Sequence, residues 1–297
     1  MALELLILLL FPRLKQKILK FLTVFILILI NLLICFAVLT AILANILLFH
    51  PHQDLSAYNR LKTNPKMQEV TIKYKNSTYS GWFVKNAPDS SPLIIYFGGN
   101  GGCASNSCAY LNKLWPFLNN YNFLTIDYPT YGQSTGPLNE KTYLQTALSA
   151  YNYAISRPDA DASQIIIIGY SIGTCGAAYL ASQKPVRGLI LIAPYDNALS
   201  LYNSALNIFR GPLSLLPSYR LDSISYAKKV SVKPLIITSA SDELIDHKLS
   251  ENLSKYFPKS PDFHLLTGLS HSDYNADPQV QTLMSAYIKE SLSQNIP

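Results

Sequence analysis

The longest apolar stretch of the chain lies near its N-terminus, where residues 21–49 include no charged side chain. A helix needs about 20 apolar residues to cross a bilayer, so this stretch is long enough to span one. A cleavable signal peptide has an apolar segment of about 7–15 residues followed by small residues, whereas this stretch is longer and rich in Leu and Ile. A soluble helix of this length would not be apolar on every face. The pattern therefore predicts a retained transmembrane anchor over residues 21–49.

After a predicted polar linker over residues 50–67, the pattern changes to short apolar runs that alternate with helical periods. Residues 68–85 alternate apolar and polar positions with a period of two, which predicts a β-hairpin. Further strands are predicted at 93–97, 122–127, 164–168, 188–193, 234–238 and 263–266. Helices are predicted at 138–156, 173–184, 197–208, 246–257 and 277–293. This alternation predicts an α/β domain over residues 68–297, with a mostly parallel sheet and helices on both faces.

The composition supports a folded domain and excludes some partners. Hydrophobic residues make up 49% of the chain and charged residues 14%, which excludes a disordered polymer. The net charge is +6, and about half of it comes from a basic N-terminal segment over residues 1–20. The small remaining surplus argues against nucleic acid as a partner. The Gly-rich segment near residue 98 lacks the Lys-Ser/Thr pair of a nucleotide-binding loop.

The basic residues ahead of the anchor predict its orientation. Lys and Arg tend to remain on the cytoplasmic side, so we expect a single-pass protein whose domain lies on the non-cytoplasmic side. The first stretch, Ala2–Phe11, is too short to span and is followed by Pro12, so we expect it at the membrane interface. Cys103 and Cys108 can form a disulfide outside the cytoplasm, and the sequence leaves open whether they do. They lack the further Cys or His ligands that a zinc site requires.

A nucleophile motif follows the predicted strand at 164–168. Gly169-Tyr170-Ser171-Ile172-Gly173 matches G-x-S-x-G and leads into a helix of small residues, which is the strand–turn–helix context that this motif requires. A turn this sharp brings the two backbones together, so side chains at 169 and 173 would collide. Ser171 then stands at the positive end of the helix, where the Ile172 amide is free to stabilise an oxyanion.

A serine hydroxyl needs a neighbouring base, and the chain has five histidines. His271 follows the last predicted strand in a loop that can reach back over the serine. His50 and His52 lie at the membrane boundary, His247 opens a helix, and His264 lies within the last strand. The sequence therefore predicts His271 as the general base.

The acid of such a site is expected after the preceding strand, in the chain order Ser, acid, His. Asp242 occupies that place and would fix the tautomer of the histidine. Asp196, after an earlier strand, and Asp273, beside the histidine, remain alternatives. Glu243 is expected to point away, and Asp246 to cap the next helix.

Together these motifs resemble the α/β-hydrolase superfamily, and closely its membrane-anchored, short-lidded branch that includes the eukaryotic protein depalmitoylases. The resemblance covers roughly residues 68–290 and includes two further motifs, Tyr-Phe-Gly-Gly-Asn-Gly-Gly at 96–102 and Asp-Tyr-Pro-Thr-Tyr-Gly-Gln-Ser-Thr-Gly at 127–136 with Glu140. It implies an α/β-hydrolase fold. The 127–136 motif is a structural signature to which we assign no catalytic role.

The resemblance also implies a second oxyanion donor. In the family the 96–102 motif reads His-Gly-Asn-Ala/Gly, and its backbone contributes to the oxyanion hole. The matching position is Asn100, with Gly99 as a second candidate beside it. This chain has Gly98 where the family has a histidine that braces the loop.

The leading hypothesis for function is a hydrolase of carboxylic esters or thioesters that forms an acyl-enzyme. A serine peptidase or amidase, and a non-catalytic membrane-tethered binding module, remain as alternatives. We expect the lipid bilayer and an acylated or small-molecule substrate with an apolar chain as partners, and neither a cofactor nor a metal ion. The segment 193–234 is too short for a large lid. Its apolar residues either line an acyl groove or simply cover the sheet: Leu201, Tyr202, Leu206, Phe209, Leu213, Leu215, Leu216 and Tyr219.

Overall fold

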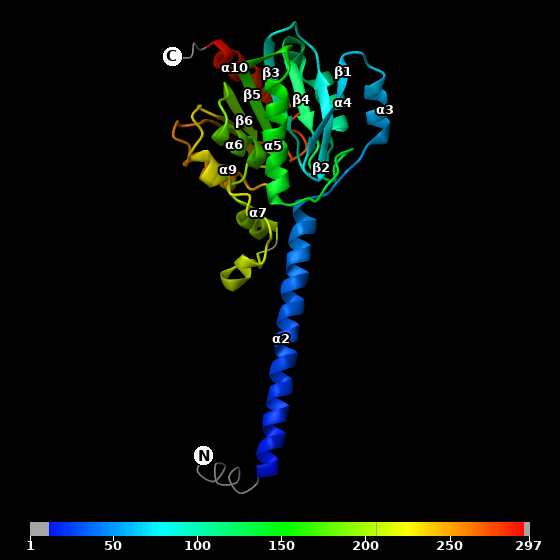
Figure 1. The fold of residues 1–297 in the computed structure, drawn as a ribbon. Helices are drawn as coiled ribbons and strands as arrows, with labels where there is room; N and C mark the ends of the chain where they lie inside the picture. The colour runs from blue at the N-terminus through cyan, green and yellow to red at the C-terminus, as the bar shows by residue number, and fades with distance from the viewer. Residues whose placement is uncertain (1–11, 206, 294–297) are drawn as a thin grey trace.

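The computed structural model describes residues 12–205 and 207–293, and its domain is organised around one eight-stranded sheet (Figure 1). The strand order is β1-β2-β4-β3-β5-β6-β7-β8. The strands are β1 (Met67–Tyr74), β2 (Ser77–Val84), β3 (Ser91–Phe97), β4 (Asn122–Ile126), β5 (Ala160–Tyr170), β6 (Gly188–Ile192), β7 (Leu235–Ser239) and β8 (Asp262–Leu266). β2 pairs antiparallel with both β1 and β4, and the other pairings are parallel. The predicted mostly parallel sheet is confirmed.

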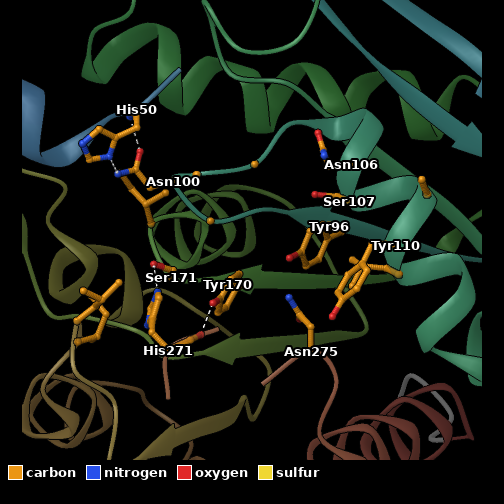
Figure 2. A pocket seen from close by; sticks show the side chains of 18 of the residues that line it. His50, Tyr96, Asn100, Asn106, Ser107, Tyr110, Tyr170, Ser171, His271 and Asn275 are labelled. Atoms are coloured by element: carbon orange, nitrogen blue, oxygen red, sulfur yellow. Dashed lines mark hydrogen bonds between the residues drawn. The ribbon is translucent and has the colours of Figure 1, made fainter. Parts of the chain in front are cut away.

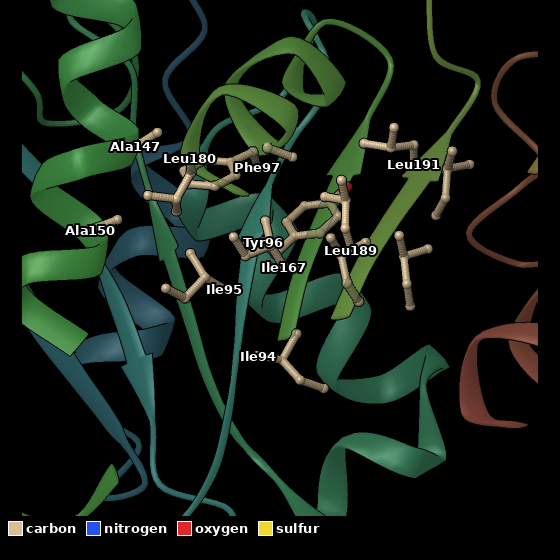
Figure 3. Packing of buried hydrophobic residues seen from close by; sticks show 14 of the residues in the cluster. Ile94, Ile95, Tyr96, Phe97, Ala147, Ala150, Ile167, Leu180, Leu189 and Leu191 are labelled. Carbon is tan, nitrogen blue, oxygen red and sulfur yellow. The ribbon is translucent and has the colours of Figure 1, made fainter. Parts of the chain in front are cut away.

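Helices cover both faces of this sheet. Successive residues of a strand point to opposite faces, and Ile94, Ile95, Tyr96 and Phe97 of β3 are all buried, as Figure 3 shows for the centre of the core. The helices are α3 (Leu55–Lys62), α4 (Ala104–Leu114), α5 (Glu140–Ile155), α6 (Gly173–Gln183), α7 (Ala198–Ala205), α8 (Ser223–Ala227), α9 (His247–Ser254) and α10 (Pro278–Ser293), with 3-10 turns η1 (Pro116–Asn120) and η2 (Gly211–Leu215).

One long helix, α2 (Pro12–Leu48), projects from the domain (Figure 1). Its candidate span, Leu14–Thr40, has a mean hydropathy of 3.0 and none of its most apolar window is buried. The helix is thus long and apolar enough to cross a bilayer, a criterion that a signal sequence near an N-terminus also meets. The predicted interfacial stretch Ala2–Phe11 lies outside the described residues.

The segment expected as a polar linker, 50–67, contains helix α3. The side chains of Ala57 and Leu61, one helical turn apart, are buried, and Asp54 caps the helix by accepting a hydrogen bond from the Ala57 amide. Helix α3 packs beside α4 and β1, so this stretch is structured and contributes to the core.

The two loop cysteines are free and lie on helix α4. Cys103 caps the helix, and its thiol donates to Asn106 Oδ1 over 2.6 Å. Cys108 is buried one turn further on and contacts Met67 Sδ at 3.5 Å. In this structure the pair makes no disulfide, and each thiol has its own partner.

Asp127 stands directly after β4 and holds two loops together. Its Oδ1 accepts a hydrogen bond of 2.6 Å from the Ala104 amide at the start of α4. Gly132, with φ of 50°, passes so close that a Cβ there would lie 2.0 Å from Asp127 Oδ2. Burial raises the pKa of Asp127 to about 7, although hydrogen bonds from the Ala104 and Gln133 backbones oppose the rise. The motif at 127–136 is therefore a structural brace.

Replacing Asp127 by asparagine is expected to make stability less dependent on pH. The folded-state pKa of about 7 lies above the unfolded value of 3.8, so the carboxyl stabilises the fold at low pH and this contribution is lost as pH rises toward 7. Asparagine keeps an acceptor for the Ala104 amide and cannot ionise. The melting temperature of Asp127→Asn relative to wild type should rise between about pH 4 and 7, and a difference that stays constant over this range would contradict the assignment.

Candidate active site

The serine elbow has the strained geometry that its motif requires. Ser171 lies between the end of β5 and the start of α6 with φ of 54°, in the left-handed region. A Cβ at Gly173 would lie 2.2 Å from the Phe97 carbonyl oxygen, and one at Gly169 would lie 2.7 Å from the Ala177 Cβ. Both glycines are therefore required by the close approach of strand and helix, as the sequence predicted.

The structure brings the three predicted catalytic residues into one hydrogen-bonded chain. Ser171 Oγ lies 2.9 Å from His271 Nε2. On the other side of the ring, His271 Nδ1 lies 2.9 Å from Asp242 Oδ2 and 3.0 Å from Oδ1. Ser171 and His271 are 6% and 9% exposed, so the pair is shielded from most solvent yet reachable. This is the arrangement in which a histidine can remove a proton from a serine hydroxyl.

The environment of Asp242 keeps it ionised. Burial raises the pKa of this carboxyl, but hydrogen bonds from His271 and from the Ile245 and Leu244 amides outweigh burial and lower it below its ordinary value. Both amides donate to Oδ1 over 2.9 Å, and the Tyr274 hydroxyl donates to Oδ2 over 3.0 Å. A negative Asp242 stabilises the imidazolium that forms when the histidine takes a proton.

The alternative acids are occupied elsewhere. Asp196 accepts hydrogen bonds from the Asn197 amide and the Asn252 side chain, and Asp273 accepts from the backbone and hydroxyl of Ser270. Within the described residues neither contacts the ring of His271. The predicted cap of α9 is present, because the Asp246 side chain accepts from the Lys248 amide.

Three residues around the histidine were missed by the sequence analysis. Glu243 was expected to point away, but its Oε2 accepts a 2.9 Å hydrogen bond from the His271 amide, so this prediction is wrong. The Tyr170 hydroxyl donates to the His271 carbonyl, and its ring stacks on the imidazole with centroids 5.3 Å apart. Tyr274 reaches Asp242 from the same loop as the histidine. These contacts fix the backbone and the plane of the base.

The predicted oxyanion donors lie beside the serine. Ile172 begins the turn into α6, and within the described residues its amide donates to no protein acceptor. A Cβ on Gly99 would lie 3.5 Å from the Ser171 Cβ, so this backbone passes next to the nucleophile. The Asn100 side chain is turned toward His50 (Figure 2), and its Oδ1 accepts a hydrogen bond from the Tyr131 hydroxyl. Such an arrangement leaves backbone amides available for an oxyanion.

An open pocket of about 930 Å³ surrounds the nucleophile. Apolar side chains contribute much of its wall: Leu48, Ile172, Leu201, Tyr202, Leu244 and Ile245. Polar residues beyond Ser171 include Tyr96, Asn106, Ser107, Tyr110 and Asn275 (Figure 2). Arg60 and Lys113 are the charged side chains among the lining residues that the structure describes.

The residues proposed from sequence to line an acyl groove differ in location: some line the pocket, some are buried in the core and one is exposed. Leu201 and Tyr202 line the pocket. Phe209 and Tyr219 are buried in the core, whereas the side chain of Leu215 is 73% exposed. Leu206 lies outside the described residues. The segment thus both covers the sheet and contributes to the pocket wall.

Comparison with known proteins finds similarity to alpha/beta hydrolases. Residues 92–233 match the family model of the alpha/beta hydrolase fold. The chain is 24% identical over 223 residues to the alpha/beta hydrolase domain-containing protein aho-3 of Caenorhabditis elegans, covering 75% of this chain and 64% of that protein. It is 25% identical over 210 residues to the human alpha/beta hydrolase domain-containing protein 17C, covering 71% of this chain and 62% of that one. The chain thus spans less than two thirds of these relatives.

Among solved structures, the Pyrococcus furiosus esterase Pf2001 has a similar fold. It superposes with a TM-score of 0.66 at 16% identity, covering 83% of this chain and 98% of the esterase. At this identity the likeness concerns the fold. The sheet topology, the serine elbow and the matched family model agree that this chain has the α/β-hydrolase fold.

Proposed function

We propose that this chain is a membrane-anchored serine hydrolase that cleaves carboxylic esters or thioesters. The observation that carries the proposal is the hydrogen-bonded chain from Ser171 through His271 to Asp242 at the wall of the 930 Å³ pocket. Fold alone supports many activities, so this geometry is the main argument.

The residues perform this reaction in two steps. In the first, His271 Nε2 takes the proton of Ser171 Oγ as the oxygen attacks the acyl carbon, and the resulting oxyanion accepts hydrogen bonds from the Ile172 amide and the Gly99–Asn100 backbone. The imidazolium then protonates the departing alcohol or thiol, which leaves an acyl-enzyme. In the second step His271 removes a proton from water, whose oxygen attacks the acyl carbon; His271 then returns that proton to Ser171 Oγ as the bond to the acyl group breaks and the acid is released.

The pocket favours a substrate with an apolar acyl chain. Leu48, the last residue of α2, lines the pocket together with Leu201 and Tyr202 of α7. With α2 in a bilayer, this wall faces the membrane side of the domain, as the position of α7 beside the upper end of α2 in Figure 1 indicates. A chain partly withdrawn from the lipid can therefore reach Ser171 along apolar side chains.

Activity should increase with acyl length if this wall binds the chain. Each buried methylene contributes up to about 0.8 kcal/mol and a tenfold change corresponds to about 1.4 kcal/mol, so burial of about two of the added methylenes should raise kcat/KM by about tenfold from acetyl to octanoyl esters. The measurement compares p-nitrophenyl esters, matched thioesters and anilides on the detergent-solubilised full chain, with Ser171→Ala as the blank. A flat length profile would contradict the acyl groove, and faster cleavage of amides than of matched esters would support a peptidase. Activity no higher than the blank with every substrate would support a binding module.

We also propose that α2 spans the membrane with the domain on the non-cytoplasmic side, because Arg13, Lys15, Lys17 and Lys20 precede the charge-free stretch that begins at residue 21. In sealed, cytoplasm-side-out vesicles the domain should resist added protease until detergent is present. A cytosolic marker protein on the outer face, digested in the same tube, is the control. Digestion of the domain without detergent would show that the domain lies on the cytoplasmic side. Cys103 and Cys108 are free, so they give no support to a non-cytoplasmic location through a disulfide.

A further inference from the structure

The residues at the end of helix α2 and directly after it pack against the domain, with no flexible linker in between. Leu48 and Phe49 are only 3% and 5% exposed. The Phe49 ring packs against Tyr143, with centroids 5.6 Å apart, and against Tyr219, at 4.8 Å. We call Leu48, Phe49 and His50 the strap. Leu48 and Phe49 are buried in the domain although they directly continue the apolar helix, and the exposed His50 is held by hydrogen bonds.

The last residue of the strap is bonded to the loop that passes the nucleophile. The His50 amide donates to Asn100 Oδ1 over 2.6 Å, and His50 Nδ1 lies 2.6 Å from Asn100 Nδ2. The Tyr131 hydroxyl donates to the same Oδ1 over 2.8 Å and accepts from the His50 amide at 2.9 Å. Figure 2 shows the His50 and Asn100 side chains facing each other above Ser171.

These contacts define the orientation of the Asn100 amide. Its oxygen already accepts from the His50 amide and from Tyr131, so its nitrogen is the group that faces the imidazole. An amide nitrogen only donates, and His50 Nδ1 must therefore supply a lone pair. The histidine thus acts as an acceptor in its Nε2–H tautomer, a role that lysine or alanine could not fill.

The loop has few other restraints near this point. In the run from Gly98 to Gly102, Asn100 is the one residue with a side chain. Cβ atoms built on Gly101 and Gly102 would have no heavy atom within 4 Å, so nothing packs against these positions in the described structure. Glycine-rich backbone has a large conformational entropy to lose, and a loosely held donor stabilises an oxyanion poorly. The Tyr128 hydroxyl fixes the other end of the loop by donating to the Gly98 carbonyl over 2.9 Å.

We propose that His50 is a positioning residue for the oxyanion hole, acting through Asn100, so that the strap following the anchor completes the active site. The proposal rests on the proposed hydrolase function. The charge on the oxyanion develops only in the transition state, so a displaced donor lowers kcat and changes KM little. The strap therefore links the seating of α2 on the domain to the rate of catalysis.

The test compares His50→Ala, His50→Gln and His52→Ala in the full chain, with p-nitrophenyl butyrate in detergent. Loss of a complete oxyanion donor costs about 10²–10³-fold in kcat, so loosening one should cost about tenfold or more in His50→Ala. KM should stay within about twofold, because ground-state binding is unchanged. Glutamine can still accept from Asn100 Nδ2 and should keep most of the activity. His52 is exposed and bonds Gly132 through its backbone carbonyl, so His52→Ala is the matched control and should behave as wild type.

A second variant keeps the test decisive if His50→Ala folds poorly. Asn100→Ala retains the loop backbone and removes the contact from the other side, so it should lower kcat by a similar factor. Combined with His50→Ala, it should add little further loss. A kcat of His50→Ala equal to that of His52→Ala, an equal loss in the Gln and Ala variants, or additive losses in the double variant would overturn the proposal. If instead wild type is no more active than Ser171→Ala, the hydrolase function itself fails.

Discussion

Replacing Ser171 by alanine is expected to lower kcat by about 10⁴-fold or more and to abolish labelling by a fluorophosphonate probe. The hydroxyl lies 2.9 Å from His271 Nε2 and is the group from which the base can take a proton. His271→Ala should cause a loss of similar size, because the serine and its base act as one unit. The double variant should then be little worse than either single variant.

The measurement is in-gel labelling together with steady-state hydrolysis of a short ester by the full chain. Ser272→Ala provides a matched control, since this serine is exposed, adjoins the base and, among the described residues, its hydroxyl bonds that of Ser270. It should label and turn over as wild type does. Persistent labelling of Ser171→Ala at the wild-type rate would show that another side chain is the nucleophile, and the proposed function would lose its main support.

Asp242→Asn is expected to lower kcat by about 10³–10⁴-fold while the fold remains intact. The Ile245 and Leu244 amides hold Oδ1, so the new amide nitrogen takes the place of Oδ2, which faces the imidazole. That nitrogen donates to Nδ1 and places the imidazole proton on Nε2, where it prevents His271 from accepting the serine proton. The loss should be smaller than that of Ser171→Ala.

The comparison for this variant is Asp196→Asn. Asp196 follows an earlier strand and was an alternative candidate for the acid in the sequence. Asp196 bonds Asn252 and a neighbouring amide, so its replacement should change the melting temperature more than kcat. Circular dichroism and thermal melting of both variants separate a folding defect from a catalytic one. A much larger fall in kcat for Asp196→Asn than for Asp242→Asn would mean that the acid is assigned wrongly.

The sheet was predictable because its strands carry strong local signals. Buried parallel strands appear as unbroken apolar runs, and the predicted strand at 188–193 corresponds to β6 at Gly188–Ile192. Helices α3 and α4 were missed for a physical reason. In α3 only Ala57 and Leu61 are buried, and in α4 Ser and Asn residues interrupt the apolar period. Their positions come from packing against the sheet, which local sequence does not display.

The central part of the candidate site was also predictable, since chain order and the elbow motif single out Ser171, His271 and Asp242. The residues that hold these in place were not. Tyr170 meets the His271 carbonyl across 101 positions, and His50 meets Asn100 across 50. Contacts of this kind depend on which loops the finished sheet brings together. No local spacing rule encodes them, and His50 in particular was interpreted only as a residue at the membrane boundary.

The lack of a flexible linker between α2 and the domain also determines how the enzyme would encounter its substrate. A catalytic domain on a flexible linker reorients freely around its anchor and samples many distances from the membrane surface. Here Leu48 and Phe49 are buried and the exposed His50 is hydrogen-bonded to Asn100, which keeps the mouth of the pocket at one height and one tilt relative to α2. With α2 in a bilayer, encounter becomes a search in two dimensions by lateral diffusion. The encounter rate is then high for esters in the same leaflet, whereas membrane anchoring does not raise the encounter rate for water-soluble esters.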